Sequence, residues 1–221
     1  MELAPTDLDL AQRYKLMIGA IVPRPIAFVS TVSIDGALNL APFSFFNGVG
    51  SNPMTVVFCP ANDIEGAEKD TLRNCKPEAE GGTGEFVVNL AIESYFREVS
   101  AASEPLPHGD SEFDLTGLAA APSRVVQPPR VAASPLAFEC RTSHVVRTNP
   151  GEPAGGNAVF GEVVHVHVDD AVVDERLRID PDRLAAIGRM GGTVYCTTRQ
   201  RFSVPRGRAA LDHPSSLDDL L

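Results

Sequence analysis

The stretch NLAPFSFFNGVGSNPMTVVF, residues 39–58, decides how the rest of the chain is interpreted. Small amides and hydroxyls interrupt its apolar residues, and prolines stand at positions 42 and 53. It is too polar for a membrane span and too broken for a helix. Phe43, Phe45 and Phe46 crowd together where a turn is needed. The stretch therefore predicts a bend between two strands that brings aromatic and polar side chains together.

Segments rich in β-branched and aromatic residues surround this bend. The segment RPIAFVSTVSIDGALNLAPF, residues 24–43, predicts a hairpin whose turn is Asp35–Gly36. Further strands are predicted at 54–60, 86–92, 136–148, 157–170 and 191–198. Helices are predicted at 7–18, capped by Thr6 or Asp7, and at 69–76, 94–102 and 181–188. Strands outnumber helices and βαβ alternation is missing, which predicts a mainly β fold, an antiparallel β-barrel with peripheral helices.

The composition limits the class of protein. The chain has 221 residues, 43% of them hydrophobic, so it can bury the core of one larger domain or two small ones. Its formal net charge is −10 and no basic face is visible, so nucleic-acid binding is not expected. The four cysteines are far apart and lack a C-x-x-C pair, which indicates reduced thiols and a cytoplasmic location.

Neither a secretory signal nor a membrane span is expected. The N-terminal sequence MELAPTDLDLAQRYKL has acidic residues and no apolar run before a cleavage site. No stretch approaches about 18 consecutive apolar residues.

Two histidine-containing segments raise other possibilities. His165 and His167 lie two apart on one predicted strand and share a face, so they could supply two metal ligands. No suitable further ligands are visible, so no metal is expected, and the pair is assigned to the solvent or subunit face with Val164, Val166 and Val168 inward. The segment HGDSEFD, residues 108–114, could hold paired carboxylates but is interpreted as a solvated loop.

Polar groups gather near the opening stretch. The hairpin places Ser30, Thr31 and Ser33 near Asn39, while a cation and a hydroxyl stand at the predicted helix start, residues 69–71. Free N–H groups, the helix dipole and a lysine favour an anion there. The aromatic bend could pack against a flat ring. Together these pieces suit a flat heterocycle bearing a phosphate, although a Ser/Thr strand, a capped helix and an aromatic turn would explain each piece separately.

Several motifs in this order resemble the flavin reductase-like, FMN-binding split-barrel family, over roughly residues 20–200. They are RPIAFVSTVSIDGALNLAPFSFFNGVGSNPMTVVF, KDTLRN, EFVVNL, EFDLTGL, PPRVAASPLAFECR, GEVVHVHVDD and IGRMGGTVYCTT. The resemblance implies a split β-barrel, a homodimer and non-covalent FMN near the dimer interface, with FMN expected in preference to FAD. It implies a flavin-binding unit at 21–205, preceded by a helical extension (1–20) and followed by a polar tail (206–221). The link CKPEAEGGTGEF, residues 75–86, is longer than the family's minimal pattern.

The resemblance also implies the cofactor-binding residues. These are Arg24, Thr31, Asn39, Ala41, Pro42, Phe43, Ser44, Lys69, Asp70, Thr71, Gly192 and Tyr195. Lys69 and Thr71 are expected at the phosphate and Arg24 at the phosphate or ring. Gly192 and Tyr195 are expected to approach the flavin across the dimer.

The implied activity is that of an NAD(P)H:flavin oxidoreductase, with hydride delivered to flavin N5 and reduced flavin supplied to a partner monooxygenase. Hydride delivery needs no acid or base, so no catalytic residue is assigned. Three alternatives remain open: a flavin-binding or electron-transfer protein without nicotinamide turnover, a split barrel holding haem or a deazaflavin, and a metal site at His165 and His167.

Overall fold

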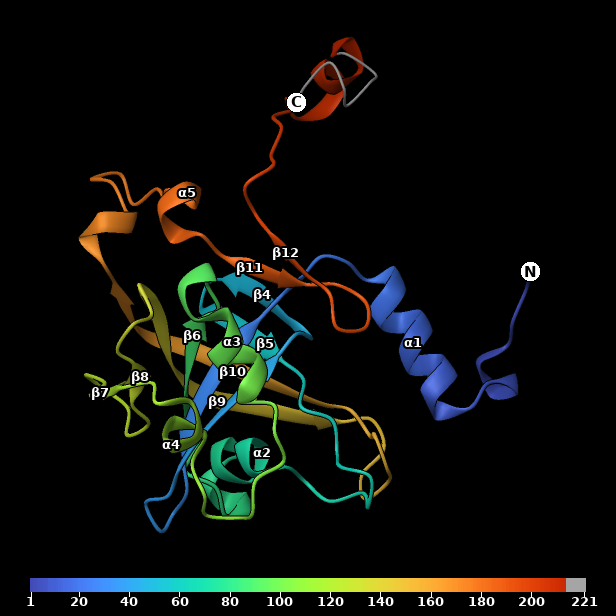
Figure 1. Cartoon of the computed structure of the whole chain (residues 1–221), viewed down its shortest axis with the longest axis vertical. Coiled ribbons are helices and arrows are strands. Elements are labelled where there is room, and N and C mark those ends of the chain that lie inside the picture. The colour runs from blue at the N-terminus through green and yellow to red at the C-terminus, as the bar shows by residue number, and fades with distance from the viewer. Residues whose placement is uncertain (214–221) are drawn as a thin grey trace.

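A seven-stranded antiparallel sheet forms the centre of the structure, a computed structural model that describes residues 1–213 (Figure 1). The strand order is β3-β2-β6-β9-β10-β5-β4. In that order the strands are Leu38–Phe43, Ala27–Val32, Glu85–Leu90, Leu136–Arg147, Asn157–Val168, Met54–Phe58 and Phe46–Ser51.

The sheet is rolled into a barrel, as the connection between its two edge strands shows. Strands β3 and β4 lie at opposite edges of the sheet, yet only Ser44 and Phe45 separate them in sequence. The edges of a flat seven-stranded sheet would lie about 29 Å apart, whereas two linking residues span at most about 11 Å. The sheet must therefore curl until its edges meet at this bend. The aromatic turn of the opening stretch is the seam of the barrel.

The predicted hairpin forms next to the seam. Strands β2 and β3 pair with Thr31 opposite Asn39, and Gly36 adopts a φ of +89° in the turn. Glycine tolerates this left-handed conformation without the steric cost of a Cβ atom. This register brings the Thr31 hydroxyl and the Asn39 amide to the same place on the sheet, as the predicted hairpin required.

The barrel interior is apolar. Phe58 lies at its centre, with ring centroids 5.2 Å from Phe43 and 5.1 Å from Phe86. A Cβ atom at Gly161 would lie 2.2 Å from Phe86, so the interior requires glycine there. The buried residues of this cluster are Ala27, Val29, Val56, Phe58, Leu72, Cys75, Phe86, Val88, Cys140 and Val159.

Helices and two small sheets surround the barrel. The helices are α1 (Leu10–Ala20), α2 (Asp70–Cys75), α3 (Phe96–Ala101), α4 (Glu112–Thr116) and α5 (Pro181–Leu184). One small sheet has the order β1-β11-β12, with bounds Arg24–Pro25, Ile187–Arg189 and Tyr195–Thr197. The other pairs β7 (Ala120–Ala121) with β8 (Arg130–Val131). Across residues 1–213, no helix combines the length and the apolar character needed to cross a bilayer.

The predictions for two helices were wrong in their limits. The first helix is capped by Asp9, whose side chain accepts from the Gln12 backbone N–H in a capping box, so it begins later than predicted. The predicted helix at 181–188 ends at Leu184, and Ala185 has a φ of +47°. Residues 187–189 then form strand β11, because pairing with β1 and β12 outweighs local helix propensity.

The stretch 103–134, interpreted from sequence as a surface excursion, contributes to the core. Phe113 on α4 is buried against the outer face of β2 and β3, in a cluster with Phe28 and Leu40. Val126 and Val131 are buried as well. This stretch covers a second apolar face of the sheet, which explains why β2 is buried along its whole length.

The predicted orientation of the last long strand was also wrong. Val164 and Val166 are 37% and 39% exposed, whereas His165 and His167 are half-buried. The register between β9 and β10 shifts between Val163 and His165, and the segment after α4 covers the histidine face. Alternation alone could not show which face would be covered.

Candidate functional site

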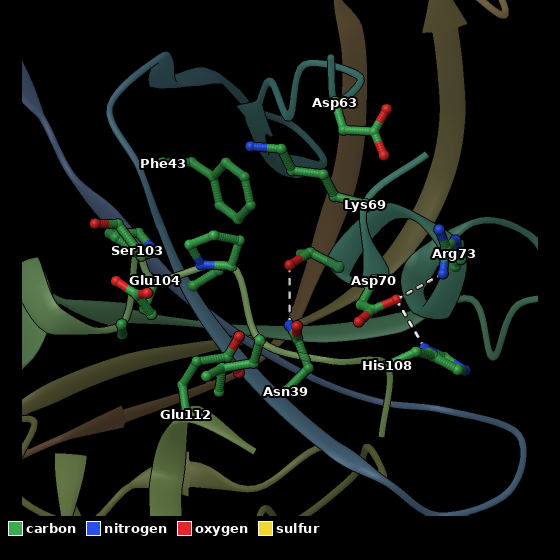
Figure 2. A pocket seen from close by; sticks show the side chains of 16 residues that line it. Asn39, Phe43, Asp63, Lys69, Asp70, Arg73, Ser103, Glu104, His108 and Glu112 are labelled. Atoms are coloured by element: carbon green, nitrogen blue, oxygen red, sulfur yellow. Dashed lines mark hydrogen bonds and ion pairs between the residues drawn. The ribbon is translucent and has the colours of Figure 1, made fainter. Parts of the chain in front are cut away.

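A cavity of about 320 Å³ lies beside β3 and the start of α2, under the segment that follows α3 (Figure 2). Its lining comprises Asn39, Ala41, Pro42, Phe43, Asp63, Lys69, Asp70, Thr71, Arg73, residues 102–106, His108 and Glu112. Most of the residues that the sequence assigned to the cofactor therefore meet around one cavity.

Asn39 and Thr71 line the cavity and belong to a buried hydrogen-bond network beneath it, here called the polar floor. The other members of the polar floor, Thr31 and Asn74, do not line the cavity. The Asn39 amide nitrogen donates to the Thr31 hydroxyl (3.1 Å) and to the Thr71 hydroxyl (2.9 Å). Asn74 donates to the Thr31 hydroxyl at 3.0 Å. All four residues are at most 7% exposed. The polar floor fixes α2 to β2 and β3, so it positions the start of the helix at the cavity.

Phe43 and Lys69 form the rim of the cavity, and their environment differs from that of the buried polar floor. Figure 2 shows the Lys69 side chain extending beside the Phe43 ring. Lys69 is exposed, and within residues 1–213 its ammonium group makes no ion pair or hydrogen bond. Its charge is therefore available to a ligand.

Two of the carboxylates around the cavity, Asp70 and Asp63, are engaged in hydrogen bonds, whereas within residues 1–213 the side chain of the exposed Glu104 makes none. Asp70 accepts from Arg73 and contacts His108, both at 2.9 Å (Figure 2). Asp63 accepts from the backbone N–H groups of Ala67 and Glu65, and the Ala67 contact is the main reason why its pKa is lowered. These bonds reduce the repulsion that an anionic ligand would meet.

Glu112 is the residue that sequence reasoning most clearly missed. Instead of lying in a solvated loop it is 8% exposed, lines the cavity and accepts from the Leu40 backbone N–H at 2.8 Å. Burial raises the pKa of its carboxyl group. The apolar Phe113 beside it was the available signal, because that residue anchors the first turn of α4 in the core.

Arg24 and Ser44 do not line the cavity. The Arg24 guanidinium is 4% exposed and donates to the carbonyl oxygens of Ile18, Ile21 and Met190 at 2.6, 2.7 and 2.9 Å. It also donates to the Ser44 hydroxyl at 3.1 Å. These bonds join the end of α1 to the barrel seam and to β11.

Gly192 and Tyr195 also lie outside the cavity lining of this chain. The Tyr195 ring packs against the Arg189 guanidinium, 4.4 Å from the ring centroid. Both residues belong to the β11–β12 region of the small sheet. Within one chain, therefore, this region contributes nothing to the cavity.

The lining suits a flavin carrying a phosphate. Pro42, Phe43 and Leu106 offer apolar surface for a planar ring, and Lys69 supplies a cation. The volume lies at the low end of the range for small-molecule sites, about 300–1,000 Å³. One chain thus offers the contacts of a flavin site but only part of an enclosure.

Comparisons with known proteins identify relatives that are similar to this chain in sequence and in fold. Nitrilotriacetate monooxygenase component B from Bacillus cereus is 32% identical, with a TM-score of 0.84 over 92% of this chain and 98% of its own. The 2-nitrobenzoate 2-nitroreductase NbaA of Pseudomonas fluorescens is 30% identical, with a TM-score of 0.81 over 94% and 97%. An uncharacterized protein of Aquifex aeolicus is 36% identical over 88% of this chain and 94% of its own length.

A structural neighbour described as a split-barrel protein, from Shewanella frigidimarina, is 21% identical, covers 94% of this chain and all of its own, and has a TM-score of 0.78. This likeness confirms the predicted split-barrel fold. The model of the flavin reductase like domain matches residues 18–188. The chain therefore belongs to the flavin reductase-like family.

Proposed function

We propose that this chain binds FMN at the cavity between β3 and α2 and acts as an NAD(P)H-dependent flavin reductase. Family membership implies flavin binding. The observation that carries the assignment to this cavity is the free Lys69 ammonium beside Phe43, directly above the polar floor. We propose FMN in preference to FAD because the rim of the cavity carries one cation, Lys69, and the cavity has little room for the adenine nucleotide half of FAD.

The chain's own residues bind and orient the cofactor. Lys69 pairs with the phosphate, Phe43 and Pro42 pack against the ring, and the polar floor keeps β3 and α2 at a fixed separation. Bound flavin supplies the hydride-accepting chemistry, so no side chain is assigned a catalytic role. Thr31 and Thr71 act through the floor, since their hydroxyl groups already accept from Asn39.

A homodimer would complete the site. Helix α1 buries only Ile18 and stands at the side of the barrel (Figure 1). Its exposed apolar residues are Leu10, Tyr14, Leu16 and Met17, at 46–57%. A second copy covering this helix would bring its own Gly192 and Tyr195 toward the cavity. Sedimentation equilibrium should give the mass of two chains, and a stable monomer that binds FMN fully would contradict this proposal.

The reduced flavin is proposed to serve a separate monooxygenase, because the Bacillus cereus relative is named as a monooxygenase component. The flavin-binding unit is proposed to be 21–205, flanked by segments 1–20 and 206–221, of which 214–221 lie outside the described residues. A cytoplasmic location is proposed because all four cysteines are free thiols.

An anaerobic titration tests the function. The purified protein should be yellow, or become so with FMN, and NADH or NADPH should bleach it. A colourless protein that FMN cannot reconstitute would exclude the cofactor, and a Soret band would indicate haem instead. A yellow protein that neither nucleotide bleaches would favour a flavin-binding or electron-transfer role.

A further inference from the structure

A second pocket, of about 300 Å³, lies on the histidine face of β10. Its lining comprises Pro122, Ser123, Arg124, Arg130, Glu139, His165 and His167. It shares no residue with the lining of the flavin cavity. The two histidines therefore belong to a separate site that the flavin chemistry does not use.

Three segments build this pocket. His165 on β10 is the register partner of Glu139 on β9, and His167 lies two residues further along the same face. Arg130 is contributed by β8. Arg124 lies in the segment that precedes β8, which covers this face of the sheet.

The one carboxylate in the pocket is already satisfied. Glu139 is 2% exposed, and its two oxygens accept from the backbone N–H groups of Arg124 (2.8 Å) and Val125 (2.7 Å). These bonds hold the Arg124 backbone at the pocket. Glu139 therefore works as an anchor for the covering segment.

The pocket carries excess positive charge. Within residues 1–213 the side chains of Arg124, Arg130, His165 and His167 make no ion pair and no hydrogen bond. Two guanidinium groups thus face one buried carboxylate, in a chain whose net charge is −10. Asp169 is a further acid near His167, and its side chain accepts from the Ala171 backbone N–H.

A metal ion does not suit this arrangement. No group of three or more metal-ligating side chains with suitable geometry occurs within the described part of the chain. The Glu139 oxygens are engaged by backbone donors, and the neighbouring guanidinium groups would repel a cation. The groups that remain in the pocket, the arginine and histidine side chains, are hydrogen-bond donors that suit an anion.

We propose that this pocket binds a small oxyanion-bearing ligand, a carboxylate or a phosphate group. Arginine guanidinium groups present paired donors that match both kinds of oxyanion, and imidazole N–H groups add further donors. The Pro122 ring provides an apolar contact for the body of an organic acid. If the cations served only to neutralise Glu139, one of them would be expected within ion-pair distance of it, and none of those in the described residues is.

Isothermal titration of the FMN-saturated protein in phosphate-free buffer tests the site, with inorganic phosphate and benzoate as separate probes. Saturable binding of about one molecule per chain is expected for at least one probe, and the tighter probe identifies the ligand class. Arg130→Gln should weaken that binding at least tenfold. Arg176→Gln, which removes an exposed cation elsewhere, should leave it unchanged.

Two further proteins make the result unambiguous. Lys69→Ala excludes phosphate uptake at the flavin site, and it keeps the test valid if the chain does not retain FMN. Arg124→Gln provides a second pocket variant in case Arg130→Gln fails to fold, as judged by circular dichroism. Non-saturable uptake of both probes, or equal affinity in the pocket variants and in Arg176→Gln, would overturn the proposal.

Discussion

The residues that the sequence assigned to the flavin fall into two groups with opposite environments. Arg24, Thr31, Asn39 and Thr71 are buried, and their polar groups bond to the protein itself. Lys69 is exposed and has no partner in the described chain. The same residue types can build a site or contact its ligand, and only their existing bonds tell these roles apart. Substitutions in the first group should reduce stability, and those in the second should reduce affinity.

Arg24→Met should give the largest loss of stability. The methionine keeps much of the apolar stem but removes the donors to three carbonyl oxygens and Ser44. The free energy of unfolding should fall by about 3 kcal/mol, since bonds to a charged donor contribute about 1.5–3 kcal/mol each and carbonyl groups stay buried. Urea denaturation measures this. If FMN affinity falls tenfold with stability unchanged, Arg24 is a ligand after all.

Asn39→Ala tests the polar floor and should have an intermediate effect. It removes two buried hydrogen bonds and leaves the Thr71 hydroxyl without its donor. The loss of stability should be about 2 kcal/mol, and FMN affinity should fall as well because α2 is no longer fixed to β3. Thr55→Ala is the control, because its hydroxyl group only donates to the Pro53 carbonyl oxygen at an exposed turn. Equal losses in the two variants would contradict a special role for the floor.

Lys69→Ala should affect affinity and leave stability unchanged. Losing one charge-assisted contact to the phosphate should weaken FMN binding by about 1–2 kcal/mol, roughly five- to thirty-fold. Fluorescence quenching of FMN measures this. Arg176→Ala is the matched control, since it lowers the net charge equally at a site far from the cavity in the chain. Unchanged affinity in Lys69→Ala would move the phosphate elsewhere.

Glu112→Gln should have the smallest effect. The effect should appear only in how the free energy of unfolding depends on pH. Burial raises the pKa of Glu112 above its usual 4.5. As pH rises from the pKa of Glu112 in the unfolded chain to its higher pKa in the folded chain, the unfolded chain loses this proton first. The free energy of unfolding therefore falls. Glutamine keeps an acceptor for the Leu40 N–H and cannot ionise. The variant should therefore gain stability relative to wild type as pH rises from 4.5.

Thermal unfolding across pH measures this difference. Glu175→Gln, at an exposed position outside the cavity, should follow the wild-type pH dependence. Parallel curves for wild type and Glu112→Gln would show that the Glu112 carboxyl ionises as freely in the folded chain as in the unfolded one.

Local patterns were sufficient for the barrel and for the part of the cavity lining that comes from β3 and the start of α2. The Asp35–Gly36 turn fixes the β2–β3 register, because side chains alternate on a strand and the short connection between Ser33 and Ala37 leaves little freedom. The residues from Asn39 to Phe43 and from Lys69 to Thr71 meet because α2 packs on this hairpin. Their closeness in sequence already indicated a common site.

Long-range packing decided what the sequence could not. The stretch 103–134 has little regular periodicity, so apart from the apolar Phe113 nothing local indicated that Glu112 would enter the cavity, and nothing indicated that Arg124 and Arg130 would meet the two histidines. Strand β11 is likewise a product of pairing with β1 and β12, since Pro181 and Asp180 begin a helix there. In each case at least one partner is distant in sequence, and the contacts outweigh local propensity.

The sequence by itself determined the strand pattern, the hairpin and the residue types around the cavity that we propose for the flavin, because turn chemistry and alternation act over a few neighbouring residues. Only the tertiary structure decided which polar groups are bonded internally and which remain free for a ligand. Hydrogen bonds and burial depend on segments brought together from across the chain, and these contacts place Arg24 at the barrel seam and leave Lys69 at the rim.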